Sequence, residues 1–171
     1  MKLEELRMLI HAETNEHVRK GLGYISANPK SDHIPLLVEG LVVATDALIR
    51  YEIEAMLGAM NVQGAEQALI QCMKSKSNSS VGVKLLEFMW SNGFAGEGHL
   101  EFLLQYASQF GLLGWIEMTS ILEVGESKYG LDELKASYMY INAIKKDQLD
   151  PEEKALIEDV KNNLLSFIDA N

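Results

Sequence analysis

The side chains that most often do chemistry in proteins include histidine and cysteine, and this sequence has four of the first and one of the second. The histidines are His11, His17, His33 and His99. None has an acid three residues before it, so the Glu-x-x-His pairs of helical di-iron sites are absent. Glu13 and His17 share a helix face at i and i+4, but two side chains are too few for a metal site. We expect no resident metal.

Cys72 is the only cysteine, so it can form neither a disulfide within the chain nor a thiolate zinc cluster. It lies among apolar residues with no base close to it in the sequence, which favours a buried, inert thiol over a nucleophile. The serines of segment 77–80 lack the Gly-x-Ser-x-Gly pattern of hydrolases. We therefore predict no catalytic residue and a reducing compartment, most simply the cytoplasm.

Segment 93–98, Gly-Phe-Ala-Gly-Glu-Gly, has the composition of a phosphate-binding loop. It lacks the Lys-Ser or Lys-Thr pair that follows such loops, no strand precedes it, and Glu97 would repel a phosphate. We interpret it as a turn between helices, with a binding loop as the alternative. No cofactor is expected.

Paired carboxylates are the remaining candidates for acid–base chemistry. Glu97 and Glu101 are one helical turn apart, but acids this frequent on helices usually form a hydrated surface. We therefore expect a protein that is not an enzyme. The open alternative is an enzyme or small-ligand-binding protein with a pocket between helices, since scattered pocket residues leave little trace in one sequence.

The formal net charge is −10, and its distribution along the chain is uneven. Residues 1–86 hold ten acids and nine bases, whereas residues 87–171 hold fifteen acids and six bases. No lysine or arginine occurs between Lys84 and Lys128. Such a field opposes binding to nucleic acid or anionic lipid and favours a basic protein partner.

Aromatic residues accompany these acids. Trp90 and Phe94 flank a predicted helix end and could anchor a partner, although core packing is the default for most aromatic side chains. We predict that the partner-binding residues are Trp90, Phe94, Glu97, Glu101, Glu117, Glu123 and Glu126. The hypothesis is a protein-binding module, either an adaptor or a cytosolic inhibitor or immunity protein that covers a basic partner.

Apolar residues recur at helical spacing along the whole chain, and no segment alternates as a strand would, so we predict an all-α fold of about eight helices. The expected helices cover 2–27, 35–60, 64–74, 81–92, 98–110, 113–124, 132–146 and 151–168. Ser79 or Ser80 is expected to cap the fourth, and Gly93, Gly111 and Gly125 to follow helix ends.

These helices are expected to form one domain over 1–171, with N-terminal helices in 1–76 and acidic helical hairpins in 79–171. No apolar run approaches the roughly 20 residues of a membrane span. The acids of the first seven residues are unlike a signal peptide. The oligomeric state does not follow from the sequence.

Two helical segments echo one another 36 residues apart, beginning at Phe102 and at Tyr138. Here the chain resembles the Sel-one-like branch of the tetratricopeptide repeats, over residues 81–147. The matching positions of the second helix of that repeat are Asp132, Lys135, Ala136, Tyr138, Tyr140 and Ala143. The resemblance implies stacked antiparallel hairpins that serve as a scaffold or adaptor.

Overall fold

The computed structural model describes residues 1–145 and 149–171. The described residues form α-helices and short 3-10 segments, without a strand, so the predicted all-α class is confirmed. The chain divides into two compact units, Met1–Asn92 (unit 1) and Gly93–Asn171 (unit 2). The expected single domain, divided at 76–79, stays a prediction.

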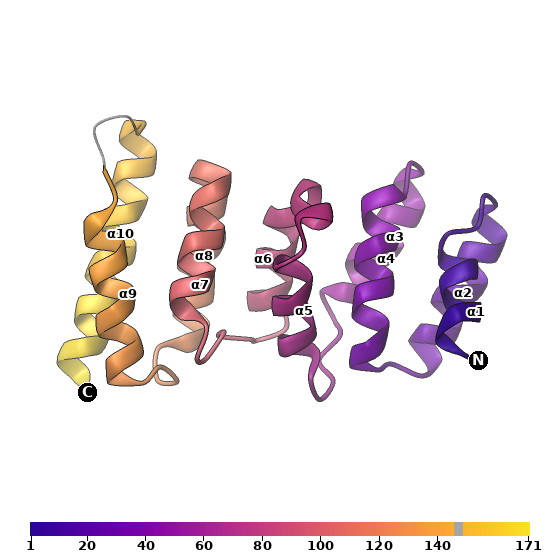
Figure 1. Cartoon of the computed structure of the whole chain (residues 1–171), viewed down its shortest axis with the longest axis horizontal. Coiled ribbons are helices and arrows are strands. Elements are labelled where there is room, and N and C mark those ends of the chain that lie inside the picture. The colour runs from indigo at the N-terminus through magenta and orange to yellow at the C-terminus, as the bar shows by residue number, and fades with distance from the viewer. Residues whose placement is uncertain (146–148) are drawn as a thin grey trace. The chain divides into compact units, whose positions relative to one another are not determined.

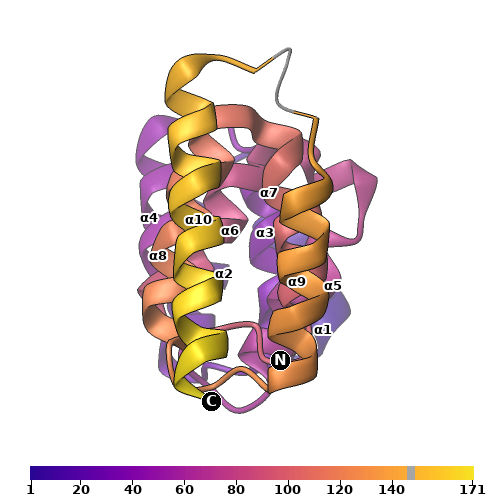
Figure 2. The ribbon, with the colours of Figure 1, turned by 90° about the vertical axis from the view of Figure 1, so that its left-hand side faces the viewer.

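Unit 1 is built from three successive helix pairs (Figure 1). Its helices are α1 (Leu3–Ile10), α2 (Asn15–Ala27), α3 (Ile34–Val43), α4 (Ala47–Leu57), α5 (Ala65–Met73) and α6 (Gly82–Ser91), with 3-10 segments η1 (Ser31–His33) and η2 (Lys76–Val81). Each helix packs against its partner in the pair, α3 also contacts α1 and α5, and α2 contacts α4. The odd-numbered helices of unit 1 therefore form one layer and the even-numbered helices the other (Figure 2).

The single helix expected over 2–27 is wrong, because residues 11–14 interrupt it. The chain reverses there, and Thr14 takes extended backbone angles before α2. The reversal lets α1 pack on α2, with Leu6 and Ile10 buried on the first helix and Leu22 on the second. Helical spacing of apolar residues continued across the turn, so the spacing alone did not reveal it.

The expected helix over 35–60 is likewise interrupted, at residues 44–46. The Asp46 carboxylate accepts hydrogen bonds from the N–H groups of Leu48 and Ile49, at 2.9 and 3.0 Å. It is therefore the N-cap of α4. The guanidinium of Arg50 donates to the Leu41 carbonyl oxygen at 2.9 Å, which satisfies an acceptor in the last turn of α3.

Buried asparagines hold the last turns of unit 1 together. The Asn92 side chain donates to the Leu57 and Phe88 carbonyl oxygens at 2.7 and 2.8 Å, which ties α4 to α6. Asn78 donates to the Cys72 carbonyl oxygen at 2.9 Å. The predicted serine caps are not formed: α6 follows η2 directly, and its N-cap position is Val81.

Unit 2 is built from two helix pairs, α7 (Leu100–Ala107) with α8 (Gly111–Gly125) and α9 (Leu131–Ala143) with α10 (Pro151–Ala170). A 3-10 segment, η3 (Ser108–Phe110), joins the first pair. Helix α7 packs on α9, and α8 on α10. Pro151 starts the last helix as predicted, whereas the expected helix end at Lys146 lies outside the described residues.

Glycine occupies three positions of unit 2 for different structural reasons. Gly93 has a φ of 76°, as expected for the residue after a helix. Gly125 is instead the last residue of α8, and a Cβ there would collide with the Tyr129 ring. At Gly114 a Cβ would lie 2.8 Å from the Ala107 carbonyl carbon and still closer to its oxygen, so α8 approaches the end of α7 too closely for a side chain.

No helix among the described residues is long and apolar enough to cross a membrane.

Candidate functional site

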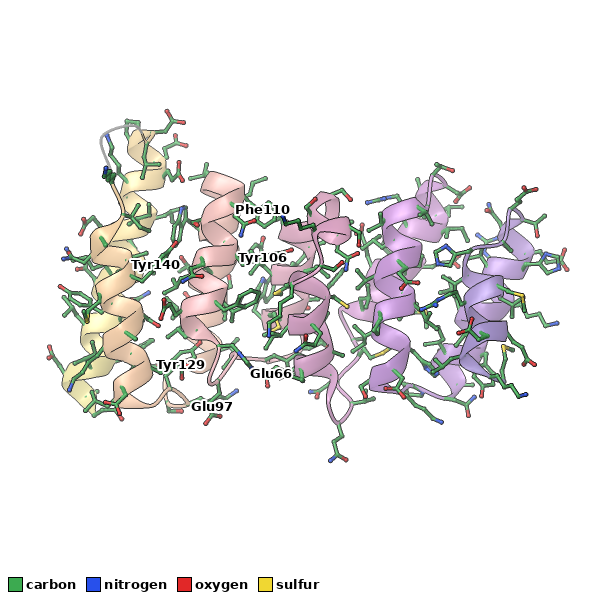
Figure 3. The ribbon with its side chains drawn as sticks, viewed as in Figure 1. Glu66, Glu97, Tyr106, Phe110, Tyr129 and Tyr140 are labelled. Carbon is green, nitrogen blue, oxygen red and sulfur yellow. The ribbon has the colours of Figure 1, made fainter. Side chains whose placement is uncertain are left out.

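Four exposed glutamates lie at one end of unit 2, which we call the acidic end. Glu97 is in the loop before α7 and Glu101 is in the first turn of α7, whereas Glu123 is in the last turn of α8 and Glu126 follows it. Because α7 and α8 run in opposite directions, the start of one helix lies beside the end of the other. Figure 3 labels Glu97 at this end, near Tyr129.

Hydrogen bonds tie the two loops of the acidic end together. The Tyr129 hydroxyl donates to the Ala95 carbonyl oxygen at 2.8 Å, and Tyr129 is only 4% exposed. The Lys128 ammonium donates to the Gly93 carbonyl oxygen at 3.2 Å. The loop that follows α8 therefore holds the loop that precedes α7.

The glycine-rich loop has a defined conformation of its own. Gly93, Gly96 and Gly98 all have positive φ, between 71° and 76°, which side chains rarely adopt. The His99 N–H donates to the Gly96 carbonyl oxygen at 2.8 Å. Phe94 is half-buried in this loop. The loop thus presents Glu97 from a fixed backbone.

A hollow of about 270 Å³ lies beside the acidic end, between the first turns of α7 and α9. His99, Glu101, Phe102 and Glu133 are among the residues that line it. One carboxylate oxygen of Glu133 accepts the Leu100 N–H at 2.9 Å, which fixes the start of α9 against the start of α7. The surface beside the acidic end is therefore hollowed, and the hollow has room for a side chain of a partner.

The charge of unit 2 is poorly balanced. It holds fourteen acids and six bases, a formal charge of −8, whereas unit 1 holds eleven acids and nine bases. Within the parts of the chain that the structure describes, Glu97, Glu101, Glu123 and Glu126 have no lysine, arginine or histidine nitrogen within 4.0 Å.

Four acids of unit 1, by contrast, form ion pairs with arginine or lysine, some within one helix and others between two helices. The pairs are Arg7–Glu39, Arg19–Glu52, Arg50–Glu54, Lys84–Glu54 and Lys84–Glu87. Such pairs cancel much of the field that an isolated carboxylate projects into solvent. The uncancelled negative charge is therefore concentrated in unit 2.

The structure brings together five of the seven residues predicted to contact a partner. Phe94 joins the four glutamates of the acidic end. Glu117 is half-buried in the middle of α8, away from that end. Trp90, 36% exposed, belongs to unit 1. Tyr129 and Glu133, which organise the acidic end, were missed, because neither stands in a recognisable motif.

Aromatic residues of α7 and η3 form a row, in which Phe102 stacks on Tyr106 and Tyr106 meets Phe110 edge to face. The rings of Phe102 and Tyr106 have centroids 5.9 Å apart, and those of Tyr106 and Phe110 5.1 Å. The Ser108 hydroxyl of η3 lies 3.3 Å from the Tyr140 hydroxyl of α9, which links these two elements. Tyr106 is 5% exposed, so this row is mainly a packing feature.

Unit 1 contains a different kind of site, a pocket of about 350 Å³ between the turn of the α1–α2 hairpin and the turn of the α3–α4 hairpin. Its apolar lining includes the buried side chains of Ile10, Val18 and Ile49. Glu13 and Asp46 contribute carboxylates. We call it the hairpin-turn pocket. Its size is at the lower end of the range for small-molecule sites.

Groups that could hold a metal or act as a nucleophile are not assembled. Among the described residues, no cluster of three or more histidine, cysteine, aspartate or glutamate side chains could hold a metal ion. Burial raises the pKa of the Cys72 thiol to about 11, with a further contribution from the charge of Glu39. The thiol is therefore protonated at neutral pH, which does not favour nucleophilic chemistry.

Comparison with protein-family models, curated proteins and solved structures finds no match. The resemblance to Sel-one-like repeats therefore stays a prediction.

Proposed function

We propose that the protein is a non-enzymatic binding module whose acidic end engages a basic surface of another protein. The observation that carries this proposal is a set of four exposed glutamates that, among the described residues, have no basic nitrogen within 4.0 Å. A partner with clustered lysines or arginines would meet these carboxylates without first displacing an internal ion pair. The hollow beside Glu101 and Phe102 could receive one of its side chains.

Opposite charge on two proteins mainly speeds their encounter and selects the partner. These are the requirements of an inhibitor or immunity protein that must cover a basic active site quickly, and of an adaptor that selects among partners. Both versions place the protein in the cytoplasm, where Cys72 would stay reduced.

The test is affinity capture from the native host with three forms of the full chain. The first is wild type, and the second replaces Glu97, Glu101, Glu123 and Glu126 by glutamine. The third, a matched control, replaces four exposed acids elsewhere: Glu4→Gln, Glu16→Gln, Glu152→Gln and Asp159→Asn. Each variant loses four negative charges, so the two variants have the same net charge.

A basic protein that wild type and the control recover, and that the acidic-end variant loses, is the expected result. Failure of all three forms to recover a protein, or equal recovery by all three, would count against the acidic end as the binding site.

A second candidate function, small-ligand binding, is favoured by the hairpin-turn pocket of unit 1. The pocket combines an apolar lining with polar groups from two hairpin turns, as small-molecule sites commonly do. It does not compete with the first proposal, because the two sites belong to different units.

A further inference from the structure

We infer that the hairpin-turn pocket binds a small organic cation, a protonated amine carried on an aliphatic or aromatic body. This inference rests on the second candidate function, that the pocket is a ligand site, and adds the chemical class of the ligand.

The apolar part of the ligand would lie against the lining of the pocket. Val43 is 55% exposed and offers this part of the ligand an accessible contact, whereas Ile10, Val18 and Ile49 belong to the core and form the packed wall behind it. Gly40 completes this wall, and a Cβ there would lie 2.6 Å from Ile10 Cγ2. The absence of a side chain at Gly40 thus lets α1 and α3 close tightly at the pocket.

The charged part of the ligand would meet two carboxylates. Asp46 is kept ionised, because hydrogen bonds from the Ile49 N–H and the Asn15 side chain lower its pKa. Asn15 donates to Asp46 Oδ2 at 3.0 Å, and this bond joins the two hairpin turns. Asp46 accepts three hydrogen bonds and has capacity for a fourth. Glu13, on the opposite turn, is exposed.

No lysine or arginine lines the pocket, although the charge of Arg19 contributes to lowering the pKa of Asp46 and Arg50 donates to the backbone of Ala44, which lines the pocket. Arg19 pairs with Glu52 at 3.0 Å, and Arg50 donates to the Leu41 and Ala44 carbonyl oxygens. His11 lines the pocket but lies 3.5 Å from Glu39. Within the described part of the chain, Glu13 has no base within 4.0 Å. The lining of the pocket therefore holds two carboxylates and neither a lysine nor an arginine.

These features select among ligand classes. An anion would be repelled by Glu13 and Asp46. A neutral apolar molecule would gain only the free energy of burying its apolar surface. A simple metal ion would leave the apolar wall unused, and it would find too few ligands. A protonated amine with an apolar body uses both parts of the site.

The experiment is an NMR titration of the isotope-labelled full chain at pH 7 with three probes of one carbon skeleton: hexylammonium, hexan-1-ol and hexanoate. Hexylammonium is expected to shift the amide signals of segments 10–18 and 40–49 in a saturable manner. Hexan-1-ol should bind about fivefold more weakly, the discrimination that one solvent-exposed ion pair provides. Hexanoate should cause no saturable shift.

Variants connect the effect to the pocket. The pair Glu13→Gln and Asp46→Asn should weaken hexylammonium binding to the level of hexan-1-ol, and asparagine still caps a helix, so α4 is preserved. A matched pair outside the pocket, Glu4→Gln and Asp32→Asn, should bind as wild type does. Ala44→Leu, which adds volume to the pocket wall, should weaken all binding while leaving the circular dichroism spectrum unchanged.

The outcomes separate the ligand class from the site itself. If hexan-1-ol or hexanoate binds as well as hexylammonium at segments 10–18 and 40–49, the pocket is a ligand site but the cationic class is wrong. If no probe shifts these segments, both the inference and the second candidate function fail. Equal binding of hexylammonium to the wild type and the Glu13→Gln, Asp46→Asn variant also overturns the inference.

Discussion

Replacement of Gly114 by alanine should destabilise the protein, although alanine is normally the better helix former. Gly114 lies in the first turns of α8, where a Cβ would lie 2.8 Å from the Ala107 carbonyl carbon. Contacts of real Cβ atoms are essentially never under 3.0 Å, so α8 would have to move away from α7. The obstacle is backbone, which cannot rotate aside as a side chain can.

The expected magnitude combines two opposing effects. Overpacking at a close contact costs about 1–3 kcal/mol, occasionally more. Alanine in place of glycine inside a helix returns about 1 kcal/mol. The net loss is therefore up to about 2 kcal/mol, a large part of the roughly 5–15 kcal/mol that stabilises a typical domain.

Gly23 provides the matched control, since it is exposed in α2 and a Cβ there would meet nothing within 4 Å. Gly23→Ala should stabilise the protein by about 0.5–1 kcal/mol. The assay is urea unfolding of the full-length variants, followed by circular dichroism and by the fluorescence of the two tryptophans, Trp90 and Trp115. A Gly114→Ala variant as stable as the Gly23→Ala variant would refute the close approach of α8 to α7.

Three further changes test other parts of the structure. Tyr129→Phe removes the buried donor to Ala95, so the free energy of unfolding in urea should fall by about 1–2 kcal/mol. Hydrogen exchange should also become faster in loop 93–99. Unchanged exchange would contradict the anchoring of that loop. Asn92→Ala leaves two carbonyl oxygens without their donor and should lower the stability by about 1–3 kcal/mol in the same assay; a neutral result would exclude the α4–α6 tie. Cys72 should react with a disulfide reagent at pH 8 only after unfolding. Because folding raises its pKa from 9.0 to about 11, its contribution to stability is complete below pH 9 and is lost as the pH rises through 11, which unfolding at several pH values would measure.

The class of the fold follows from the sequence, because helical spacing and the absence of strand patterns are properties of neighbouring residues. Local start and stop signals also worked where one residue decides the backbone, as Pro151 and Gly93 do. The turns at 11–14 and 44–46 were missed, because apolar spacing continued across them. Asp46 was a usable signal for the second turn, since aspartate is a common N-cap.

The acidic end was only partly predictable. The absence of bases between Lys84 and Lys128 pointed to a negative field, and antiparallel packing of α7 and α8 then brings Glu97 and Glu123 to one end. Tyr129 and Glu133 act through contacts with residues more than thirty positions away, and sequence spacing carries no trace of such contacts. The hairpin-turn pocket was missed for the same reason, because its residues come from two separate turns.

The central claim, that the acidic end recruits a basic partner, is tested most directly by the association rate of the captured partner at different salt concentrations. For wild type, the rate constant should fall steeply as sodium chloride rises to about 0.5 M, where screening confines charge interactions to a few ångströms. At low salt the variant that lacks Glu97, Glu101, Glu123 and Glu126 should associate about tenfold more slowly, with a shallower salt dependence. The control with Glu4, Glu16, Glu152 and Asp159 replaced should stay close to wild type. Equal rates for the two variants would contradict the claim, since the partner would then sense only the net charge of the chain.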